Sequence, residues 1–170
     1  MFSEAPHTLG TTLYFTEFPS PIGIIQLRGT EEALTGVFME EHRHQPEPPR
    51  GAVRDPSPLR AARAELEEYF AGARREFTSA LEPAGTPFQQ RVWLALREIP
   101  YGTTISYGEL ARRIGQPRAS RAVGLANGRN PISIIVPCHR VIGANGTLTG
   151  YGGGLERKRF LLALESSGAL

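Results

Sequence analysis

The stretch ISIIVPCHRVIG, residues 132–143, holds the only cysteine of the chain, Cys138, and a histidine follows it at once. The apolar run before it is β-branched and predicts a buried strand or extended segment. Pro137 lacks a backbone N–H and restricts the residue before it, so regular structure should end there. The cysteine is therefore expected where a buried segment ends, in or beside a cleft. Two interpretations are open: a nucleophilic thiol, or a small buried core residue, which is the more common role of a lone cysteine.

The residues around Cys138 suit activation of a thiol. The thiolate is the reactive form, and a neighbouring His or Arg lowers the pKa of a thiol. His139 can take the proton directly or through a water, and such a base is usually oriented by a carboxylate. Of the four glutamates in the second half of the chain, Glu165 is the best candidate, because it is expected on the inner side of the last helix. Glu109 is expected in a capping box and Glu156 in an exposed first turn.

Length and composition limit the class of protein. A chain of 170 residues suits one large domain or two small ones, and 40% apolar and 21% charged residues are typical of a soluble globular protein. No apolar run is long enough to span a bilayer, and the N-terminal sequence MFSEAPHTLG lacks the regions of a secretory signal. A single cysteine excludes an internal disulfide, a CxxC redox pair and a multi-cysteine zinc site. We therefore expect a cytoplasmic protein without a membrane partner.

Charge is distributed unevenly along the chain. Residues 1–85 carry 8 arginines and 13 acidic residues, whereas residues 86–170 carry 11 basic and 4 acidic residues. A basic half on an otherwise acidic chain suggests a polyanionic partner. Eighteen of the 19 basic residues are arginine, which suits contacts to phosphates and bases, although a GC-rich genome would enrich arginine without any function. Composition alone leaves both explanations open.

The first half of the sequence predicts a small sheet and one helix. Three apolar runs predict the strands of an antiparallel meander: residues 11–15, 22–28 and 33–39. Residues 42–58 contain five prolines and predict an exposed loop, which favours solvated side chains over a metal site for His42 and His44. A helix, a return to the sheet and a domain linker are expected over residues 58–71, 74–78 and 82–85.

The second half is mostly helical in its pattern. One helix is expected to begin after Thr86 as N-cap, and others to cover residues 106–114, 118–126 and 155–166. The middle pair predicts either a helix-turn-helix or an ordinary corner between two helices. Its second helix carries Arg118, Arg121 and Arg129 among small residues, which suits phosphate contacts but little reading of bases.

Two segments after the cysteine bear on its surroundings. Gly150–Gly154 is either a pocket wall of backbone N–H groups or a flexible loop before a helix. The last helix is expected to pack Phe160, Leu161 and Leu164 inward and to expose residues 157–159. The first alternative for the glycine-rich segment places it beside the thiol.

These residues together resemble a known family, the 6-O-alkylguanine-DNA alkyltransferases, also called methylated-DNA–protein-cysteine methyltransferases. The segment IVPCHRVI, residues 135–142, is similar to the active-site motif of that family. Further blocks resemble the family in the same order: residues 86–93, 99–102, 106–111, 119–124, 127–131 and 149–155. The resemblance covers nearly all of residues 86–170, whereas the first half matches only loosely, at residues 20–23 and 69–72.

The resemblance implies an α+β fold in two domains. Residues 1–83 would form an N-terminal α/β, RNase H-like domain with an antiparallel sheet and a helix. Residues 84–170 would form a mostly helical, winged-helix-like DNA-binding domain that carries the cysteine. The implied activity is suicidal DNA repair, in which the protein flips a 6-O-alkylguanine out of the duplex and moves the alkyl group irreversibly to its own cysteine. No cofactor is implied, and the zinc of some relatives is not expected because residues 1–83 contain no cysteine.

The resemblance also implies roles at matching positions. Cys138 would accept the alkyl group, His139 would activate it through a water, and Glu165 would orient His139. Asn130 would tie the recognition helix to the cysteine loop. The carbonyls of Cys138 and Val141 would accept the exocyclic amine of the base.

Other matching positions would bind the DNA. Arg121 would fill the gap left by the flipped nucleotide, as wedges do in minor-groove binding, and Tyr107 would help to rotate the nucleotide and would hydrogen-bond the base. The remaining expected substrate- and DNA-binding residues are Ala119, Ser120, Arg129, Tyr151 and Gly152. The partner would be double-stranded DNA, bound through its minor groove without sequence preference by a monomer that can act cooperatively.

The sequence departs from the family at one pocket position. Gly152 stands where some relatives place a serine, so a side-chain hydrogen bond to the base is lost and the backbone N–H would substitute. The alternative function is a lesion-binding protein that does not repair but signals to other pathways. Such proteins replace the cysteine, and Cys138 argues against that class. A cysteine hydrolase with an incidental helix-turn-helix is a more remote alternative.

Overall fold

The sheet of the first half follows the predicted order of strands. A computed structural model describes residues 11–43 and 45–167 of the chain. The four strands lie in the order β3-β2-β1-β4, with bounds β1 (Tyr14–Ser20), β2 (Gly23–Gly29), β3 (Leu34–Met39) and β4 (Val53–Arg54). The first three pair antiparallel, which confirms the meander, and the short β4 pairs parallel with β1. The first strand begins three residues later than expected and ends at Ser20.

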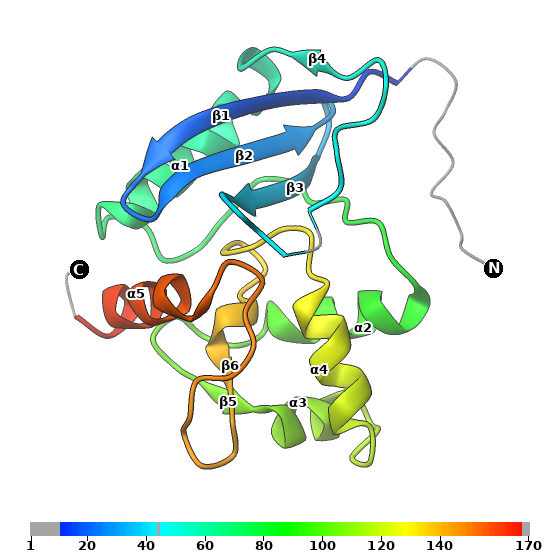
Figure 1. Cartoon of the computed structure of the whole chain (residues 1–170), viewed down its shortest axis with the longest axis vertical. Coiled ribbons are helices and arrows are strands. Elements are labelled where there is room, and N and C mark those ends of the chain that lie inside the picture. Colours follow the sequence, from blue (N-terminus) through cyan, green and yellow to red (C-terminus); the bar gives the residue numbers. More distant parts are fainter. Residues whose placement is uncertain (1–10, 44, 168–170) are drawn as a thin grey trace.

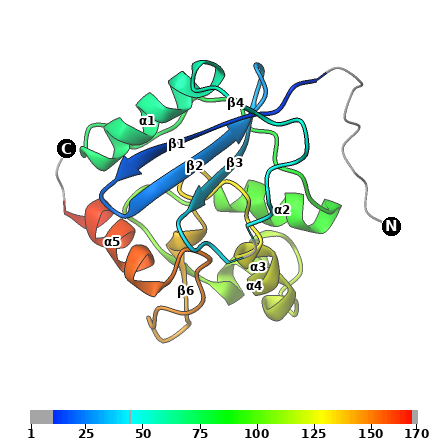
Figure 2. The same cartoon turned by 45° about the horizontal axis from the view of Figure 1, so that its top comes forward.

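Helix α1 (Arg60–Phe70) lies against one face of this sheet (Figures 1 and 2). A 3-10 turn, Ser57–Leu59, leads into it, and the Asp55 carboxylate accepts a hydrogen bond from the Ser57 N–H at 2.9 Å. Leu66 and Tyr69 of α1 are fully buried. The apolar stripe of the helix therefore packs inward, as its spacing predicts.

Two expectations for the first half are wrong. Residues 74–78 form no strand, and the chain instead rejoins the sheet through an isolated parallel bridge between Leu34 and Leu81. His42 is not solvated, because it is only 9% exposed and its Nδ1 accepts a hydrogen bond from the Met39 N–H at 3.3 Å. His44 lies outside the described residues. The loop after β3 thus packs against the protein at its start.

The second half is built mostly from helices, which lie below the sheet in Figure 1. These helices are α2 (Pro87–Leu96), α3 (Tyr107–Arg113), α4 (Ser120–Gly128) and α5 (Leu155–Ser166). The short strands β5 (Ile105–Ser106) and β6 (Val141–Ile142) pair parallel. Helix α2 is held to α4 by the Trp93 indole, which donates to the Ala126 carbonyl at 2.9 Å. The expected α+β class, with an N-terminal antiparallel sheet and a mostly helical second half, is confirmed.

The predicted helix starts agree with the structure at two places. Thr86 closes a reciprocal capping box at the start of α2. Ser106 accepts the Glu109 N–H at 3.1 Å at the start of α3, but the Glu109 carboxylate pairs with Arg112 and Arg113 instead of returning to the cap. The second box is therefore only half formed, because two nearby guanidinium groups compete for its carboxylate.

The segment before the cysteine is buried, but it is not a strand. Ile132 makes a single parallel bridge to Val37 of β3, and the chain then turns, with Ile134 at φ 74°. The Asn130 side chain accepts the Ile132 N–H and donates to the Val136 carbonyl, so it takes hydrogen bonds that a neighbouring strand would otherwise satisfy. The β-branched run predicts burial correctly, but the extended conformation is wrong because the turn closes on Asn130.

Helix α5 differs from its expected orientation. Leu161 is fully buried, but Phe160 is 38% exposed, and Lys158, which was expected on the surface, is fully buried. The inner face consists of Lys158, Leu161 and Glu165, at i, i+3 and i+7. The apolar pattern is misleading here because two charged side chains point into the core. No helix in the described part of the chain is long and apolar enough to cross a membrane.

Candidate active site

Cys138 opens a 3-10 turn, Cys138–Arg140, directly after Pro137. Its side chain is 5% exposed. Burial raises the pKa of the thiol to about 11, and the hydrogen bond with Asn130 and the charge of Lys158 oppose that rise only in part. The thiol is therefore protonated at neutral pH, so a nucleophilic role requires a base.

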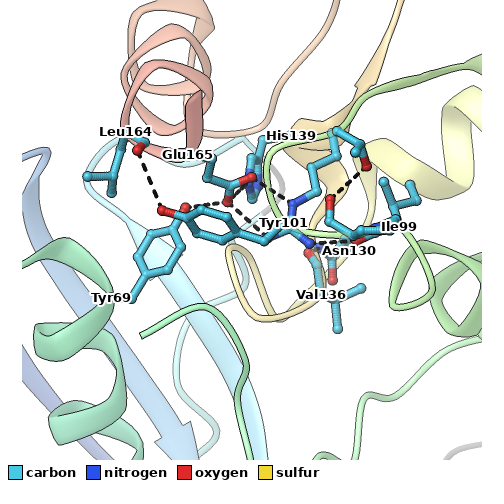
Figure 3. Close-up of polar contacts among 11 residues, drawn as sticks. Tyr69, Ile99, Tyr101, Asn130, Val136, His139, Leu164 and Glu165 are labelled. Atoms are coloured by element: carbon cyan, nitrogen blue, oxygen red, sulfur yellow. Dashed lines mark hydrogen bonds and ion pairs between the residues drawn. The ribbon is translucent and has the colours of Figure 1, made fainter. Parts of the chain in front are cut away.

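His139 is placed to supply that base. It is fully buried, and its Nε2 lies 2.7 Å from Oε2 of Glu165 (Figure 3). Burial lowers the pKa of the imidazole by more than Glu165 raises it, so the ring is neutral at pH 7. A neutral imidazole carries one proton, and the carboxylate requires it on Nε2. Nδ1, which is buried and has no hydrogen-bond partner among the described residues, is left as an acceptor.

The Glu165 carboxylate joins four donor groups from three side chains. Its Oε1 accepts from Nε of Arg140 at 2.8 Å, and its Oε2 accepts from Nη2 of Arg140 at 3.0 Å and from the Tyr69 hydroxyl at 2.6 Å, besides His139. Burial alone would raise the pKa of Glu165, but the hydrogen bonds and charges of His139 and Arg140 hold it well below its usual range. Glu165 is therefore an anion whose charge Arg140 balances, and it is suited to orienting a histidine.

Two asparagines connect α4 to the cysteine loop. Asn130 Nδ2 donates to the Val136 carbonyl at 2.7 Å, and its Oδ1 accepts from the Ile132 N–H at 3.0 Å. Asn127 Nδ2 lies 3.4 Å from the Cys138 carbonyl, to which it donates. Asn130 thus connects the end of α4 to the segment before the cysteine.

Lys158 holds the two segments that flank the site. Its Nζ donates to the carbonyls of Val141 at 2.7 Å and Thr149 at 2.8 Å. Burial lowers the pKa of Lys158 to about 8, against a raising effect of Cys138, so the amine is mostly charged at neutral pH. This cation fixes the turn after the cysteine to the start of the glycine-rich loop.

The glycine-rich loop rests on the first half of the chain. The Gly152 carbonyl accepts a hydrogen bond from the Arg43 N–H at 2.8 Å. A Cβ added to Gly152 would lie 2.5 Å from Nε2 of His42, closer than real Cβ atoms approach. Burial raises the pKa of the Tyr151 hydroxyl well above its ordinary value. A side chain at position 152 therefore does not fit here unless His42 moves.

The other predicted DNA-binding residues belong to α3 and α4. Tyr107 begins α3, and its hydroxyl donates to the Thr149 carbonyl at 3.3 Å. Half-buried positions precede and begin α4, and exposed arginines lie near its two ends: Ala119, Ser120, Arg121 and Arg129. The structure therefore brings Tyr107 to the glycine-rich loop and leaves Arg121 and Arg129 exposed near the two ends of α4.

The sequence alone does not identify three residues of the site around Cys138 and Glu165. Lys158 lay on the predicted helix, and its i, i+7 spacing from Glu165 was the signal that could have found it. The sequence indicates Arg140 only as a neighbour of the thiol, although a buried glutamate requires a cation. Tyr69 lies 96 residues from Glu165, and no local pattern connects the two. In residues 11–43 and 45–167, no three His, Cys, Asp or Glu side chains gather as metal ligands would.

Both halves of the chain match models of one protein family. Residues 13–83 match the 6-O-methylguanine DNA methyltransferase, ribonuclease-like domain, and residues 87–167 match the 6-O-methylguanine DNA methyltransferase, DNA binding domain. A methylated-DNA–protein-cysteine methyltransferase of Methanosarcina acetivorans is 56% identical over 91% of this chain and 99% of the relative. Its counterpart in Haemophilus influenzae is 50% identical over 91% of this chain and 87% of the relative.

A solved structure supports the same relationship. The crystal structure of Mycobacterium tuberculosis OGT in complex with DNA is 54% identical in sequence and superimposes with a TM-score of 0.85, over 91% of this chain and 93% of that one. Family models cover both halves, and the relatives match over nearly their whole length. The chain belongs to the 6-O-methylguanine DNA methyltransferase family.

Proposed function

We propose that this protein repairs DNA directly, by moving the alkyl group of a 6-O-alkylguanine to its own Cys138 in a single turnover. The observation that carries the proposal is the position of a buried, neutral His139 next in sequence to the buried thiol, with its Nε2 paired with Glu165. That pairing leaves Nδ1 of the imidazole as a base next in sequence to the thiol. The names of the close relatives support the same reaction.

The chemistry starts from the protonated thiol. Because the pKa of Cys138 is about 11, a permanent thiolate is not available, and His139 takes the proton through a bridging water as the sulfur attacks. Sγ forms a bond to the alkyl carbon, and the bond from that carbon to O6 of guanine breaks. The guanine anion takes up one proton, which balances the one that the thiol lost. The thioether has no route back to a thiol, so one protein repairs one base.

The alkylated base must leave the stack to reach this site. Flipping costs a few kcal/mol, and less for a damaged pair. Arg121 at the start of α4 is exposed and fills the gap in the duplex, while the small residues around it let the helix approach the minor groove closely. Tyr107 rotates the nucleotide inward and then hydrogen-bonds the base. Because damage occurs at any guanine, the protein binds DNA without sequence preference. It acts as a monomer.

The base is recognised by backbone groups near the thiol. The carbonyls of Cys138 and Val141 accept the exocyclic amine of the flipped guanine. In this structure Lys158 donates to the Val141 carbonyl, whereas the Cys138 carbonyl accepts from the Asn127 side chain and from the Val141 N–H. The two side chains therefore hold the acceptors in place for the base. The backbone N–H of Gly152 takes the part of the serine of other relatives, and Tyr151 lines the pocket.

Mass spectrometry of the protein after incubation with duplex DNA that contains 6-O-methylguanine tests the proposal. We expect a single methyl gain, located on Cys138 by peptide mapping. Cys138→Ser should abolish transfer and keep DNA binding, because the hydroxyl fills the same space. Retained transfer in that variant would refute the nucleophile, and lesion binding by the wild type without any mass gain would favour a signalling protein instead.

A further inference from the structure

One residue of the first half of the chain contacts the hydrogen-bonded pair of His139 and Glu165 beside Cys138. Tyr69, at the inner face of α1, donates its hydroxyl proton to Oε2 of Glu165 at 2.6 Å (Figure 3). The same oxygen lies 2.7 Å from Nε2 of His139. Tyr69 is fully buried, so no solvent competes for this hydrogen bond. The imidazole and the phenol therefore share one carboxylate oxygen.

We propose that Tyr69 is a positioning residue for the alkyl transfer, whose hydroxyl fixes the Glu165 carboxylate and limits its basicity toward His139. This inference rests on the proposed function, because the relay matters only if His139 serves Cys138. Through Tyr69, helix α1 of the first half contributes a side chain to the active site.

Two effects of the hydroxyl follow from the geometry. First, it restrains Oε2 from the side of α1, in addition to the two hydrogen bonds by which Arg140 holds both oxygens, so that the carboxylate cannot rotate away from the imidazole. Second, a donor to a carboxylate oxygen stabilises the anion and reduces its attraction for another proton. Glu165 then orients His139 without removing the proton from Nε2, and the lone pair on Nδ1 is preserved for the thiol.

The ring of Tyr69 has its own structural partners. Its centroid lies 5.5 Å from that of Phe70, 5.6 Å from that of Phe77 and 6.2 Å from that of Tyr101. These contacts are made by the ring and do not need the hydroxyl. A buried tyrosine hydroxyl needs a polar partner, whereas a phenylalanine would pack here without one. Packing alone therefore does not account for the hydroxyl.

The test compares Tyr69→Phe with a matched control, Tyr101→Phe. Tyr101 is half-buried and also places its hydroxyl near α5, but this hydroxyl donates to the Leu164 carbonyl at 3.5 Å and not to Glu165. For each protein, two rates are measured against pH: methyl transfer from 6-O-methylguanine in duplex DNA, and alkylation of Cys138 by iodoacetamide. Since Cys138 is the only cysteine, the second rate reports the same thiol without DNA.

We expect Tyr69→Phe to slow both reactions about tenfold, the effect of losing one hydrogen bond to a charged group. We also expect the acid limb of both profiles to move upward by about one pH unit, because a less stabilised Glu165 raises the pKa of His139. Tyr101→Phe should change neither quantity, and the affinity of either variant for DNA should match the wild type.

Three results would overturn the proposal. One is a slower rate for Tyr69→Phe with no movement of the acid limb, and another is an equal change in Tyr101→Phe, since either would reduce Tyr69 to a packing role. The third is failure of Tyr69→Phe to fold, because the hydroxyl would then be a requirement of the core. If the wild type takes no methyl group from DNA, the proposed function fails, and the iodoacetamide profiles still decide the role of Tyr69.

Discussion

Replacing Glu165 by glutamine probes both the stability and the chemistry of the site. The glutamine keeps the size of the side chain but removes the charge that faces Arg140 at 2.8 and 3.0 Å. Both side chains are buried, with 7% of Arg140 and 1% of Glu165 exposed. Removing one partner of a buried ion pair costs about 3–5 kcal/mol, because the other charge remains without compensation. We expect Glu165→Gln to lose about that much free energy of unfolding in urea titrations at pH 7.

The same substitution should also slow methyl transfer. The glutamine amide can donate to Nε2 of His139, which moves the imidazole proton to Nδ1 and removes the lone pair that serves Cys138. We expect methyl transfer from duplex DNA to slow by roughly 10⁴, the effect of losing a carboxylate that fixes a histidine tautomer. Single-turnover rates on fully folded protein give this number. A rate within tenfold of the wild type would refute the assignment of Glu165 as the orienting group.

Glu156→Gln is the matched control, because Glu156 is exposed in the first turn of the same helix. It should leave rate and stability unchanged. At low pH, the wild type should lose part of its stability advantage over Glu165→Gln. The pKa of Glu165 is depressed in the folded protein, so its stabilisation is complete above the unfolded value of about 4.3 and declines as pH falls below it. The stability difference between wild type and Glu165→Gln should therefore shrink below about pH 4, and a constant difference would contradict the depressed pKa.

Three other substitutions have definite expectations. Gly152→Ser should slow transfer, because its Cβ would lie 2.5 Å from Nε2 of His42, and His42→Ala should restore the rate in the double variant; an additive loss in the double variant would argue against the clash. Lys158→Met should lower the transfer rate about tenfold and the free energy of unfolding by about 1–3 kcal/mol, measured by single-turnover kinetics and urea titration, because two buried carbonyls lose their donor, and an unchanged rate would remove Lys158 from the site. Arg121→Ala should slow repair in duplex DNA far more than reaction with a free alkylguanine base, and equal slowing of both would reject its role in flipping.

Local chemistry explains what could be predicted from the sequence. The burial of Cys138 follows from the β-branched run and Pro137, and the start of α2 follows from Thr86. The partner of His139 was found by placing Glu165 on the inner face of the last helix, which the hydrogen bond of 2.7 Å agrees with. The first two inferences depend on residues close together in the sequence, whereas Glu165 lies 26 residues from His139 and is singled out only because the second half of the chain has four glutamates.

The features that escaped prediction depend on distant contacts. The turn at Ile134 forms because the Asn130 side chain takes backbone hydrogen bonds that the pattern assigns to a strand. Lys158 is buried because two carbonyls from other segments accept its protons, which no hydropathy pattern anticipates. Tyr69 reaches Glu165 across 96 residues, so its position depends on how α1 packs against the second half.

The stoichiometry of repair tests the central claim most directly. Purified protein is mixed with a large excess of duplex DNA that contains 6-O-methylguanine, and the number of guanines restored is followed to completion. Because the chain has one cysteine and the thioether is stable, the yield should level off at one guanine per protein molecule, with every Cys138 methylated. A yield that continues to rise while Cys138 remains a free thiol would contradict the account.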